Sequence, residues 1–349
     1  MPYPEEYQAV RRRAGLIDCS AWGVIEVRGA DRVTFLHNLL TQDIKTLASG
    51  AGREAALVSP AAKLLADLVV LADVDAHWLI LPRFRIDTAL KTLEHYLITE
   101  DVTCHERTAT HGILALQGPA AGSVLQEAAS APLATLPALA HRMITIQDVP
   151  MRTVAHSITG SPGFLLVTPA ERAAWLWEHV LQLGRAQGLR PVGWETWNVL
   201  RLEAGIPWYG IDMDESNLLP ETGLEARAVS HTKGCYVGQE VIARLLARGS
   251  ASRKLMGLVC EGNDAPGAKD PIISAGGGSA PGGKDTERVG EITSACFSPM
   301  LNRPIAMGYV KRAYYAAGTA VTVMRDDQAI PATLVNPPFV YPSARTDDS

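Results

Sequence analysis

The chain has 349 residues, a formal net charge of −5 and a sequence pI near 6.0, and 47% of its residues are hydrophobic while 20% are charged. This composition indicates a globular protein large enough for two or three domains and excludes an intrinsically disordered chain. Arg11-Arg12-Arg13 is its only basic cluster, so we expect no direct binding of nucleic acid. No apolar run is long enough to span a bilayer and the N-terminus lacks an apolar signal core, so we expect a soluble, cytoplasmic protein.

The cysteine pattern argues against disulfides and against a metal centre. The five cysteines are far apart, odd in number and never arranged as Cys-x-x-Cys. This excludes a disulfide framework and a self-contained zinc or iron–sulfur site, so we predict no metal ligands. The five are Cys19, Cys104, Cys235, Cys260 and Cys296.

The first half of the chain carries alternating helical and strand patterns. Residues 5–16 form an amphipathic helical pattern that ends at Gly15, and Asp31 is placed to cap a second helix. Pro119 is placed at the first position of a later helix. Strands are predicted at 21–28, 55–59, 64–72, 77–81 and 113–116, and a helix at 86–97.

The second half begins with a hairpin over 143–156 and helices at 169–183 and 192–203, the last ending with Gly205 as a left-handed cap. Asp264–Glu287 is rich in Gly, Pro, Ala and Ser, which predicts a flexible surface loop. Short β-like runs surround it, and they indicate a small barrel or sandwich; they lie at 254–262, 289–296, 305–311, 320–325 and 329–335.

The most distinctive stretch is residues 232–240, Thr-Lys-Gly-Cys-Tyr-Val-Gly-Gln-Glu. Gly238 is a plausible N-cap for a helix that begins at Gln239, so Cys235 would stand just before a helix N-terminus and close to Lys233. Both features favour the thiolate, so the thiol pKa should fall below its ordinary value. The alternative is a buried structural cysteine, but the polar neighbours favour a functional one.

Lys233–Glu240 resembles the signature of the YgfZ family of folate-binding proteins. Much of the remaining chain, from about Tyr7 to Val340, resembles the T-protein of the glycine cleavage system, for example in Arg201–Gly205 and Val289–Val310. The resemblance implies an α+β, T-protein-like, multi-lobed folate-binding fold with a C-terminal small β-barrel. We expect two α+β lobes within residues 1–250 and the barrel within 251–340.

The YgfZ resemblance implies a tetrahydrofolate-binding accessory protein that supports iron–sulfur cluster assembly or repair, including that of tRNA-modifying iron–sulfur enzymes. Its cofactor would be tetrahydrofolate or a derivative, and its partners a reduced folate and iron–sulfur proteins or their assembly factors; we expect a monomer. Cys235 would be the working thiol. The other motif residues are Lys233, Gly234, Tyr236, Gly238, Gln239 and Glu240.

The same resemblance leaves open whether the chain is an enzyme. T-proteins carry an Asp-Asp pair and a pterin-binding Glu, and the corresponding positions here are Ala66 (followed by Asp67) and Ser161. These replacements count against glycine-cleavage chemistry, so a tetrahydrofolate-dependent aminomethyltransferase is the alternative reading.

Four residues outside the motif are candidates for folate binding. Asp67 would bond the pterin or make a structural hydrogen bond, and Trp208 and Tyr209 would stack on it or belong to the core. Arg201 would meet the glutamate tail of the folate, or else pair internally with Glu203 or Asp212.

Overall fold

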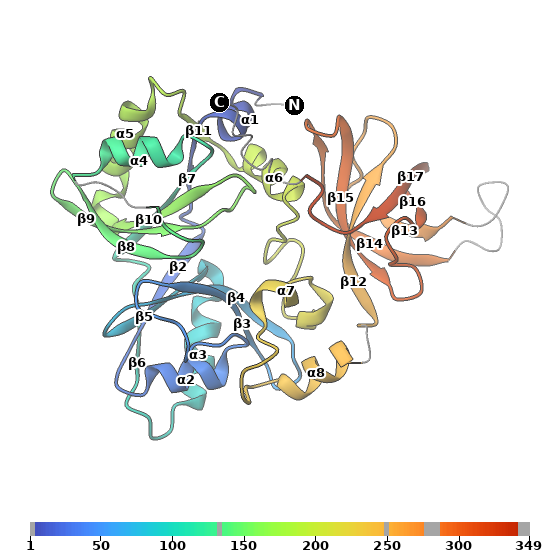
Figure 1. Ribbon diagram of the computed structural model, residues 1–349. Helices are drawn as coiled ribbons and strands as arrows, with labels where there is room; N and C mark the ends of the chain where they lie inside the picture. The colour runs from blue at the N-terminus through green and yellow to red at the C-terminus, as the bar shows by residue number, and fades with distance from the viewer. Residues whose placement is uncertain (1–3, 131–134, 248–250, 276–286, 341–349) are drawn as a thin grey trace.

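The computed structural model describes residues 4–130, 135–247, 251–275 and 287–340, and its framework is three β-sheets (Figure 1). A five-stranded sheet has the order β3-β4-β5-β2-β6 and a six-stranded sheet the order β11-β1-β7-β10-β9-β8. Six further strands close into a barrel, ordered β12-β15-β14-β13-β16-β17. This confirms the predicted α+β fold with a C-terminal barrel.

The five-stranded sheet is antiparallel and buries one face under helices α2 and α3. Successive apolar residues of its central strands point alternately into two cores, one on each face of the sheet. The predicted strands at 21–28, 55–59, 64–72 and 77–81 and the helix at 86–97 are confirmed. The elements are β2 (Trp22–Arg28), α2 (Arg32–Leu39), β3 (Gly52–Val58), β4 (Leu64–Ala72), β5 (Ala76–Pro82), α3 (Ile86–Tyr96) and β6 (Thr103–Glu106).

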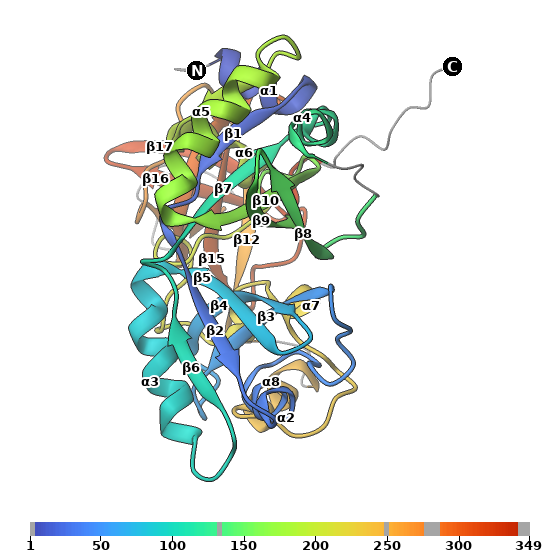
Figure 2. The same cartoon turned by 90° about the vertical axis from the view of Figure 1, so that its left-hand side faces the viewer.

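The six-stranded sheet lies above the first one, with the barrel behind both in Figure 2. Helices α4 and α5 pack on its outer face around an aliphatic core. Among the strands of this sheet that the structure describes, β1 and β11 pair in parallel and the others pair antiparallel. The antiparallel hairpin β8–β9 was predicted from sequence. The elements are α1 (Pro4–Arg12), β1 (Gly15–Asp18), β7 (His111–Gln117), α4 (Ala121–Ala128), β8 (His141–Ile146), β9 (Val149–Ala155), β10 (Gly163–Pro169), α5 (Ala173–Gly184) and β11 (Arg190–Val192).

The barrel contains one strand that the sequence reading missed. β13 lies inside the segment 264–287 that was predicted to be a loop, and Ile272 at its centre is fully buried. The rest of that prediction, over 276–286, lies outside the described residues. The strands are β12 (Arg253–Cys260), β13 (Pro271–Ser274), β14 (Arg288–Ser298), β15 (Arg303–Lys311), β16 (Ala320–Arg325) and β17 (Gln328–Val335).

Helix ends differ from the sequence reading in three places. The first helix stops at Arg12, since residues 15–18 pair with two strands. Asp31 makes no capping bond, because its carboxylate accepts the amide of Asp101. Pro119 precedes α4 rather than opening it, as the helix starts at Ala121.

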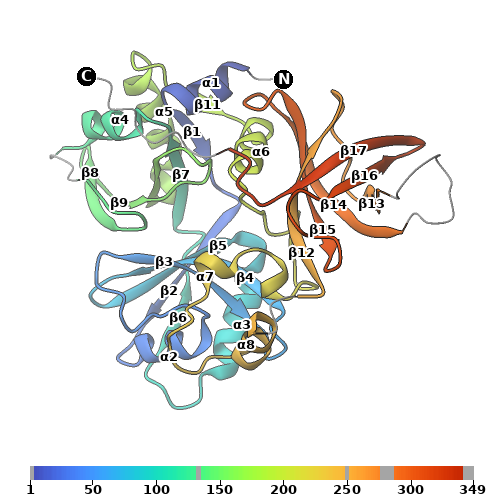
Figure 3. The same ribbon diagram turned by 45° about the vertical axis from the view of Figure 1, so that its right-hand side comes forward.

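The chain between the lobes and the barrel is helical in short pieces (Figure 3). α6 (Trp194–Glu203) lies between the six-stranded sheet and the barrel and ends as predicted at Gly205, whose φ is +68°. The amides of Ile206 and Gly205 bond to Arg201 O and Leu202 O, the pattern of a Schellman cap. α7 (Glu225–Ala228) and α8 (Gln239–Ala247) follow.

Within the described residues, no helix is long and apolar enough to cross a membrane.

Candidate functional site

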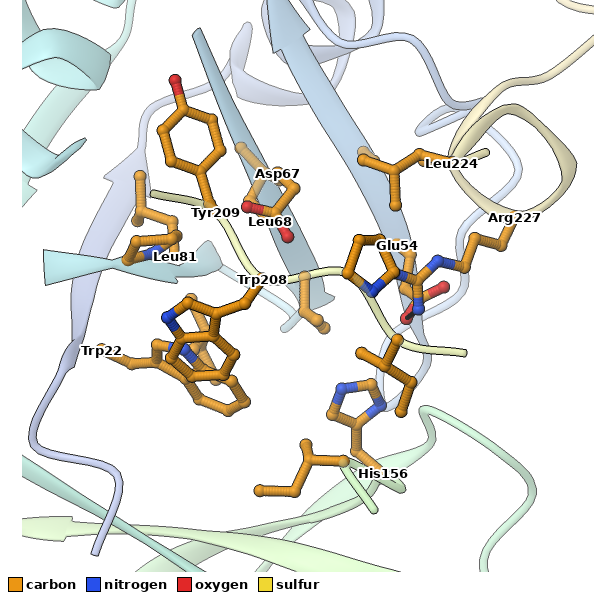
Figure 4. Close-up of a pocket in the computed structure, with 18 of the residues that line it drawn as sticks. Trp22, Glu54, Asp67, Leu68, Leu81, His156, Trp208, Tyr209, Leu224 and Arg227 are labelled. Atoms are coloured by element: carbon orange, nitrogen blue, oxygen red, sulfur yellow. Dashed lines mark hydrogen bonds and ion pairs between the residues drawn. The ribbon is translucent and has the colours of Figure 1, made fainter. Parts of the chain in front are cut away.

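A pocket lies where the two sheets and the segment after α6 meet. It encloses about 730 Å³, part of it open to solvent. β3, β4 and β5 form one wall, residues 156–158 after β9 a second, and residues 206–209 with α7 the rest. In Figure 4, Trp22 and Trp208 lie over each other on one side, with His156, Glu54 and Arg227 on the other. We call it the central pocket.

Strand alternation places Asp67 in the central pocket. Ala66 and Leu68 face the core under α2 and α3, so Asp67 between them faces the opposite side with Val69. The register between β3 and β4 shifts just before this point, between Leu57 and Val58. Such bulges are frequent next to functional sites, where they re-aim a side chain.

One oxygen of the half-buried Asp67 carboxyl group lacks a hydrogen-bond partner. Its Oδ1 is buried and accepts no hydrogen bond. Burial raises the pKa of Asp67 to about 6, although the Arg227 guanidinium lowers it. An unpaired acid with a pKa near neutrality, in a pocket, is a common feature of ligand or catalytic sites.

Four further polar residues from distant parts of the chain face the same space. Arg227 of α7 pairs with Glu54 of β3 at 3.1 Å. Burial lowers the pKa of His156 to about 4, so its ring is neutral at physiological pH. The hydroxyl of Ser157 is buried without a hydrogen-bond partner. None of these four was singled out from sequence, because only the folded sheets bring them to Asp67.

Aromatic rings form the apolar wall. Trp22 and Trp208 stack with centroids 5.9 Å apart and planes 20° apart. Tyr209 is buried, donates its hydroxyl to Leu64 O at 3.0 Å and lies 5.2 Å below the Arg85 guanidinium. Trp208 and Tyr209 therefore line the pocket and also belong to the packing around it, while their stacking on a pterin stays a prediction.

Arg201 is a structural residue. It is fully buried, and it donates to Asp212 Oδ2 at 2.5 Å, to Ile206 O at 3.1 Å and to Asn198 Oδ1 at 2.8 Å. Of the two readings left open by the sequence, the internal ion pair with Asp212 is the one that the structure contains. Among the described residues that line the central pocket, Arg201 is absent.

Neither of the two positions where T-proteins carry further acids holds an acidic side chain here. Ala66 is buried in the core under α2 and α3, on the opposite face from Asp67. Ser161 is buried in a turn, where its amide donates to Thr159 Oγ1 at 3.3 Å. Asp67 is thus the acid of the phrase that faces the pocket.

The Cys235 motif lies elsewhere, against the edge of the five-stranded sheet. Among the described residues that line the central pocket, none comes from 231–240. Cys235 is exposed, and α8 begins at Gln239 as predicted. Gly238 has φ +78°, and a Cβ there would meet Ser59 O at 2.7 Å, so this turn requires glycine.

Lys233 stabilises this turn. Its ammonium donates to the carbonyls of His37, Leu40 and Gln42 at the C-terminal end of α2, the end that favours a positive charge. It also lies 4.7 Å from the centre of the buried Tyr236 ring. Burial lowers the pKa of Lys233 to about 8.

The remaining motif residues face outward or sit at the surface. Gly234 is exposed with open space around it, and Gln239 is half-buried at the start of α8. Glu240 is exposed and pairs with Arg244 one turn later at 2.5 Å. The predicted roles of these residues stay predictions.

Comparison with known proteins identifies the superfamily. The GCVT N-terminal domain matches residues 2–233 and the glycine cleavage T-protein C-terminal barrel domain matches 253–340. An aminomethyltransferase from Symbiobacterium thermophilum is 32% identical over 96% of this chain and 88% of its own length. One from Streptomyces avermitilis is 32% identical over 90% and 83%. The crystal structure of aminomethyltransferase T from Bartonella henselae superimposes with a TM-score of 0.86 at 27% identity, covering 97% of this chain and 89% of its own.

These relatives correct the functional reading of the sequence. The predicted accessory role in iron–sulfur cluster assembly and tRNA modification is wrong, because relatives that match nearly the whole chain are named aminomethyltransferase. That prediction gave an eight-residue surface motif more weight than the rest of the fold. The alternative reading is the one that the comparisons favour, and the chain belongs to the glycine cleavage T-protein family.

Proposed function

We propose that this protein is a tetrahydrofolate-dependent aminomethyltransferase and that the reduced folate binds in the central pocket. The observation that carries the proposal is the Asp67 carboxyl group, half-buried and without a partner for Oδ1 between aromatic walls. The names of the relatives and their coverage of the chain support the reaction class.

The residues of the pocket fit a reduced pterin. A flat heterocycle with N–H groups needs apolar or aromatic faces and a hydrogen-bond acceptor at its edge. Trp22, Trp208 and Leu81 supply the faces, and Asp67 supplies the acceptor. When bound, tetrahydrofolate supplies a ring nitrogen that takes up the one-carbon unit.

The chain's own contribution to the reaction is positioning and proton handling. With a pKa near 6, the Asp67 carboxyl is mostly ionised at neutral pH and accepts an N–H of the ligand through Oδ1. The same pKa allows Asp67 to take up a proton and release it within one turnover. The Glu54–Arg227 pair and the neutral His156 ring form the remaining polar edge of the pocket. They can hydrogen-bond to a ligand there, and together they add no net charge.

The narrower assignments remain part of the proposal. The resemblance of residues 233–240 to the YgfZ motif supports the proposal that the chain belongs to a branch of its superfamily that carries this surface turn. A reduced folate is the proposed small-molecule partner, and the cytoplasmic location and monomeric state remain as expected from sequence.

Calorimetry with folinic acid tests the binding step, and ammonia release from an aminomethyl-lipoyl carrier protein with tetrahydrofolate tests turnover. We expect both for the parent protein, and loss of turnover by about 100-fold or more for Asp67→Asn. Asp75→Asn is the matched control, because Asp75 is an exposed acid that pairs with Arg28 at the surface. Absence of folinic acid binding by the parent would refute the proposal, and binding without turnover would leave a folate-binding protein that is not a transferase.

A further inference from the structure

A second pocket opens on the outer face of the six-stranded sheet, beside the start of α4. It encloses about 1250 Å³, part of it open to solvent, and we call it the α4 pocket. His156 and Ser157 line both this pocket and the central pocket, so the two spaces meet at the end of β9.

Two hydroxyl groups in the α4 pocket are buried without hydrogen-bond partners. Thr153 is 1% exposed, and its Oγ1 has no partner. Ser157 Oγ, at the junction with the central pocket, also has none. A buried hydroxyl without a partner destabilises the fold, because it has given up its hydrogen bonds to water. Two such donors beside one pocket indicate a ligand that accepts hydrogen bonds from them.

The charges around the α4 pocket favour an anion. Thr153 lies opposite Arg142 in the β8–β9 register, so both side chains leave the same face of the sheet, and Arg142 lines the pocket. Gly122 in the first turn of α4 lines the pocket, and an added Cβ there would meet nothing within 4 Å. The N-terminal end of α4, where the helix dipole favours a negative charge, therefore borders the pocket. Among the described residues that line it, none is Asp or Glu.

The rest of the lining is apolar. Pro119, Leu125, Leu136 and Phe164 surround the polar end. Free phosphate or sulfate would leave these surfaces in water, whereas a carboxylate carried on a ring or an aliphatic body would cover them.

We propose that the α4 pocket binds a carboxylate attached to an apolar body, with the carboxylate held by Thr153 and Arg142 beside the N-terminal end of α4. The carboxylate has two chemical sources. One is the p-aminobenzoylglutamate end of a folate whose pterin occupies the central pocket, and this source rests on the proposed function. The other is a separate small aromatic carboxylate, which does not.

The test is calorimetry with three probes: folinic acid, tetrahydrobiopterin (a reduced pterin without the glutamate end) and free p-aminobenzoylglutamate. Gly122→Asp adds a negative charge at the mouth of the pocket, and Thr153→Val removes the hydroxyl without changing the side-chain shape. Ser123→Asp is the matched control for the first, because it adds the same charge in the same helical turn, where the native hydroxyl bonds to Gln187 outside the pocket. Thermal melting of each variant confirms folding.

We expect free p-aminobenzoylglutamate to bind about tenfold or more weakly to Gly122→Asp, and several-fold more weakly to Thr153→Val, with tetrahydrobiopterin unaffected. If the affinity for folinic acid falls in parallel, the carboxylate is the folate tail. If the affinity for folinic acid is unchanged, the ligand is a separate carboxylate. If Gly122→Asp and Thr153→Val bind free p-aminobenzoylglutamate as tightly as the parent protein and the Ser123→Asp control do, the inference is wrong. Failure of folinic acid and tetrahydrobiopterin to bind the parent would refute the proposed function alone.

Discussion

At the scale of single residues, Asp67 combines a cost in stability with the proposed chemistry. Its pKa is about 6 in the folded protein against an ordinary value of 3.8, so the folded state holds its proton over a range where the unfolded chain has lost it. The ionised form therefore destabilises the fold. This cost develops as the pH rises from about 4 to about 6 and stays constant above that range.

Asp67→Asn should consequently stabilise the protein at about pH 8 while abolishing turnover. The rise of about two pKa units corresponds to roughly 3 kcal/mol. Each 1 kcal/mol moves the melting temperature of a large domain by about 2–4 °C, so we expect a gain of at most about 6–12 °C. The gain should vanish at about pH 4, where the native acid is already protonated. A melting temperature that falls at pH 8 would show that the native carboxylate has a stabilising partner after all.

Cys235 should be the fastest of the five thiols to react with an alkylating reagent near neutral pH. It is the exposed cysteine, whereas burial raises the pKa of Cys104 to about 11 and of Cys260 and Cys296 to about 12, and also raises that of Cys19. Peptide mapping after brief iodoacetamide treatment measures the order, with the urea-unfolded chain as control. Faster labelling of any other cysteine in the folded protein would contradict the expectation.

Sequence reasoning found part of the site because some of its residues sit in short phrases. Asp67, Trp208 and Tyr209 follow from local motifs. Glu54, His156 and Arg227 do not, since they lie more than 70 residues from one another and meet only through packing. Arg201 shows the converse: a phrase shared with a folate-binding family left a ligand contact and an internal ion pair equally open, and packing decides for the buried ion pair with Asp212.

At the scale of elements, the period-two pattern predicted nearly all of the longer strands, and short strands were the weak point. β13 has four residues, Pro-Ile-Ile-Ser, inside a stretch rich in Gly, Pro and Ala. Composition alone therefore indicated a loop. The strand is set by its neighbours, because it pairs with β14 on one side and β16 on the other and closes the barrel.

Deletion of 264–287 should therefore unfold the barrel, contrary to what the loop-like composition suggests. It removes the ladder bonds to both neighbours and the buried Ile272 side chain, and opens two strand edges. Thermal melting is the measurement, and we expect loss of a cooperative transition or a fall of more than about 8 °C. A deletion confined to 276–286 keeps β13 and is the control. An unchanged melt after the longer deletion would show that the barrel closes without this strand.

At the scale of the whole molecule, two buried polar groups join parts that the sequence keeps far apart. Arg152 of β9 donates to Asp73 at 2.5 Å and so ties the two sheets together. Asp212 joins α6 to the barrel: it accepts Arg201 at 2.5 Å, Thr293 Oγ1 at 2.6 Å and Ser294 Oγ of β14. Local patterns contain no signal for such pairings, because each partner alone is an ordinary polar residue.

Asp212 also fixes the wall of the central pocket. Its Oδ2 accepts the Trp208 amide at 2.9 Å, so one carboxylate holds α6, the barrel and the ring that stacks on Trp22. Asp212→Asn would leave the fully buried Arg201 without its counter-charge. Breaking a buried pair in this way costs about 3–5 kcal/mol. We therefore expect a melting temperature about 6–20 °C lower, together with weaker folinic acid binding through the displaced Trp208.

The double variant Asp212→Asn with Arg201→Met separates charge from shape. Removing both charges relieves the unpaired guanidinium, so the double variant should melt above the single Asp212→Asn variant. Its pocket wall should remain loose, because the Trp208 amide still lacks the carboxylate that holds it. Partial recovery of stability without recovery of ligand binding is thus the expected pair of results from melting and calorimetry. A double variant no more stable than the single one would show that the hydroxyl and amide contacts of Asp212, rather than its charge, hold the barrel to the lobes.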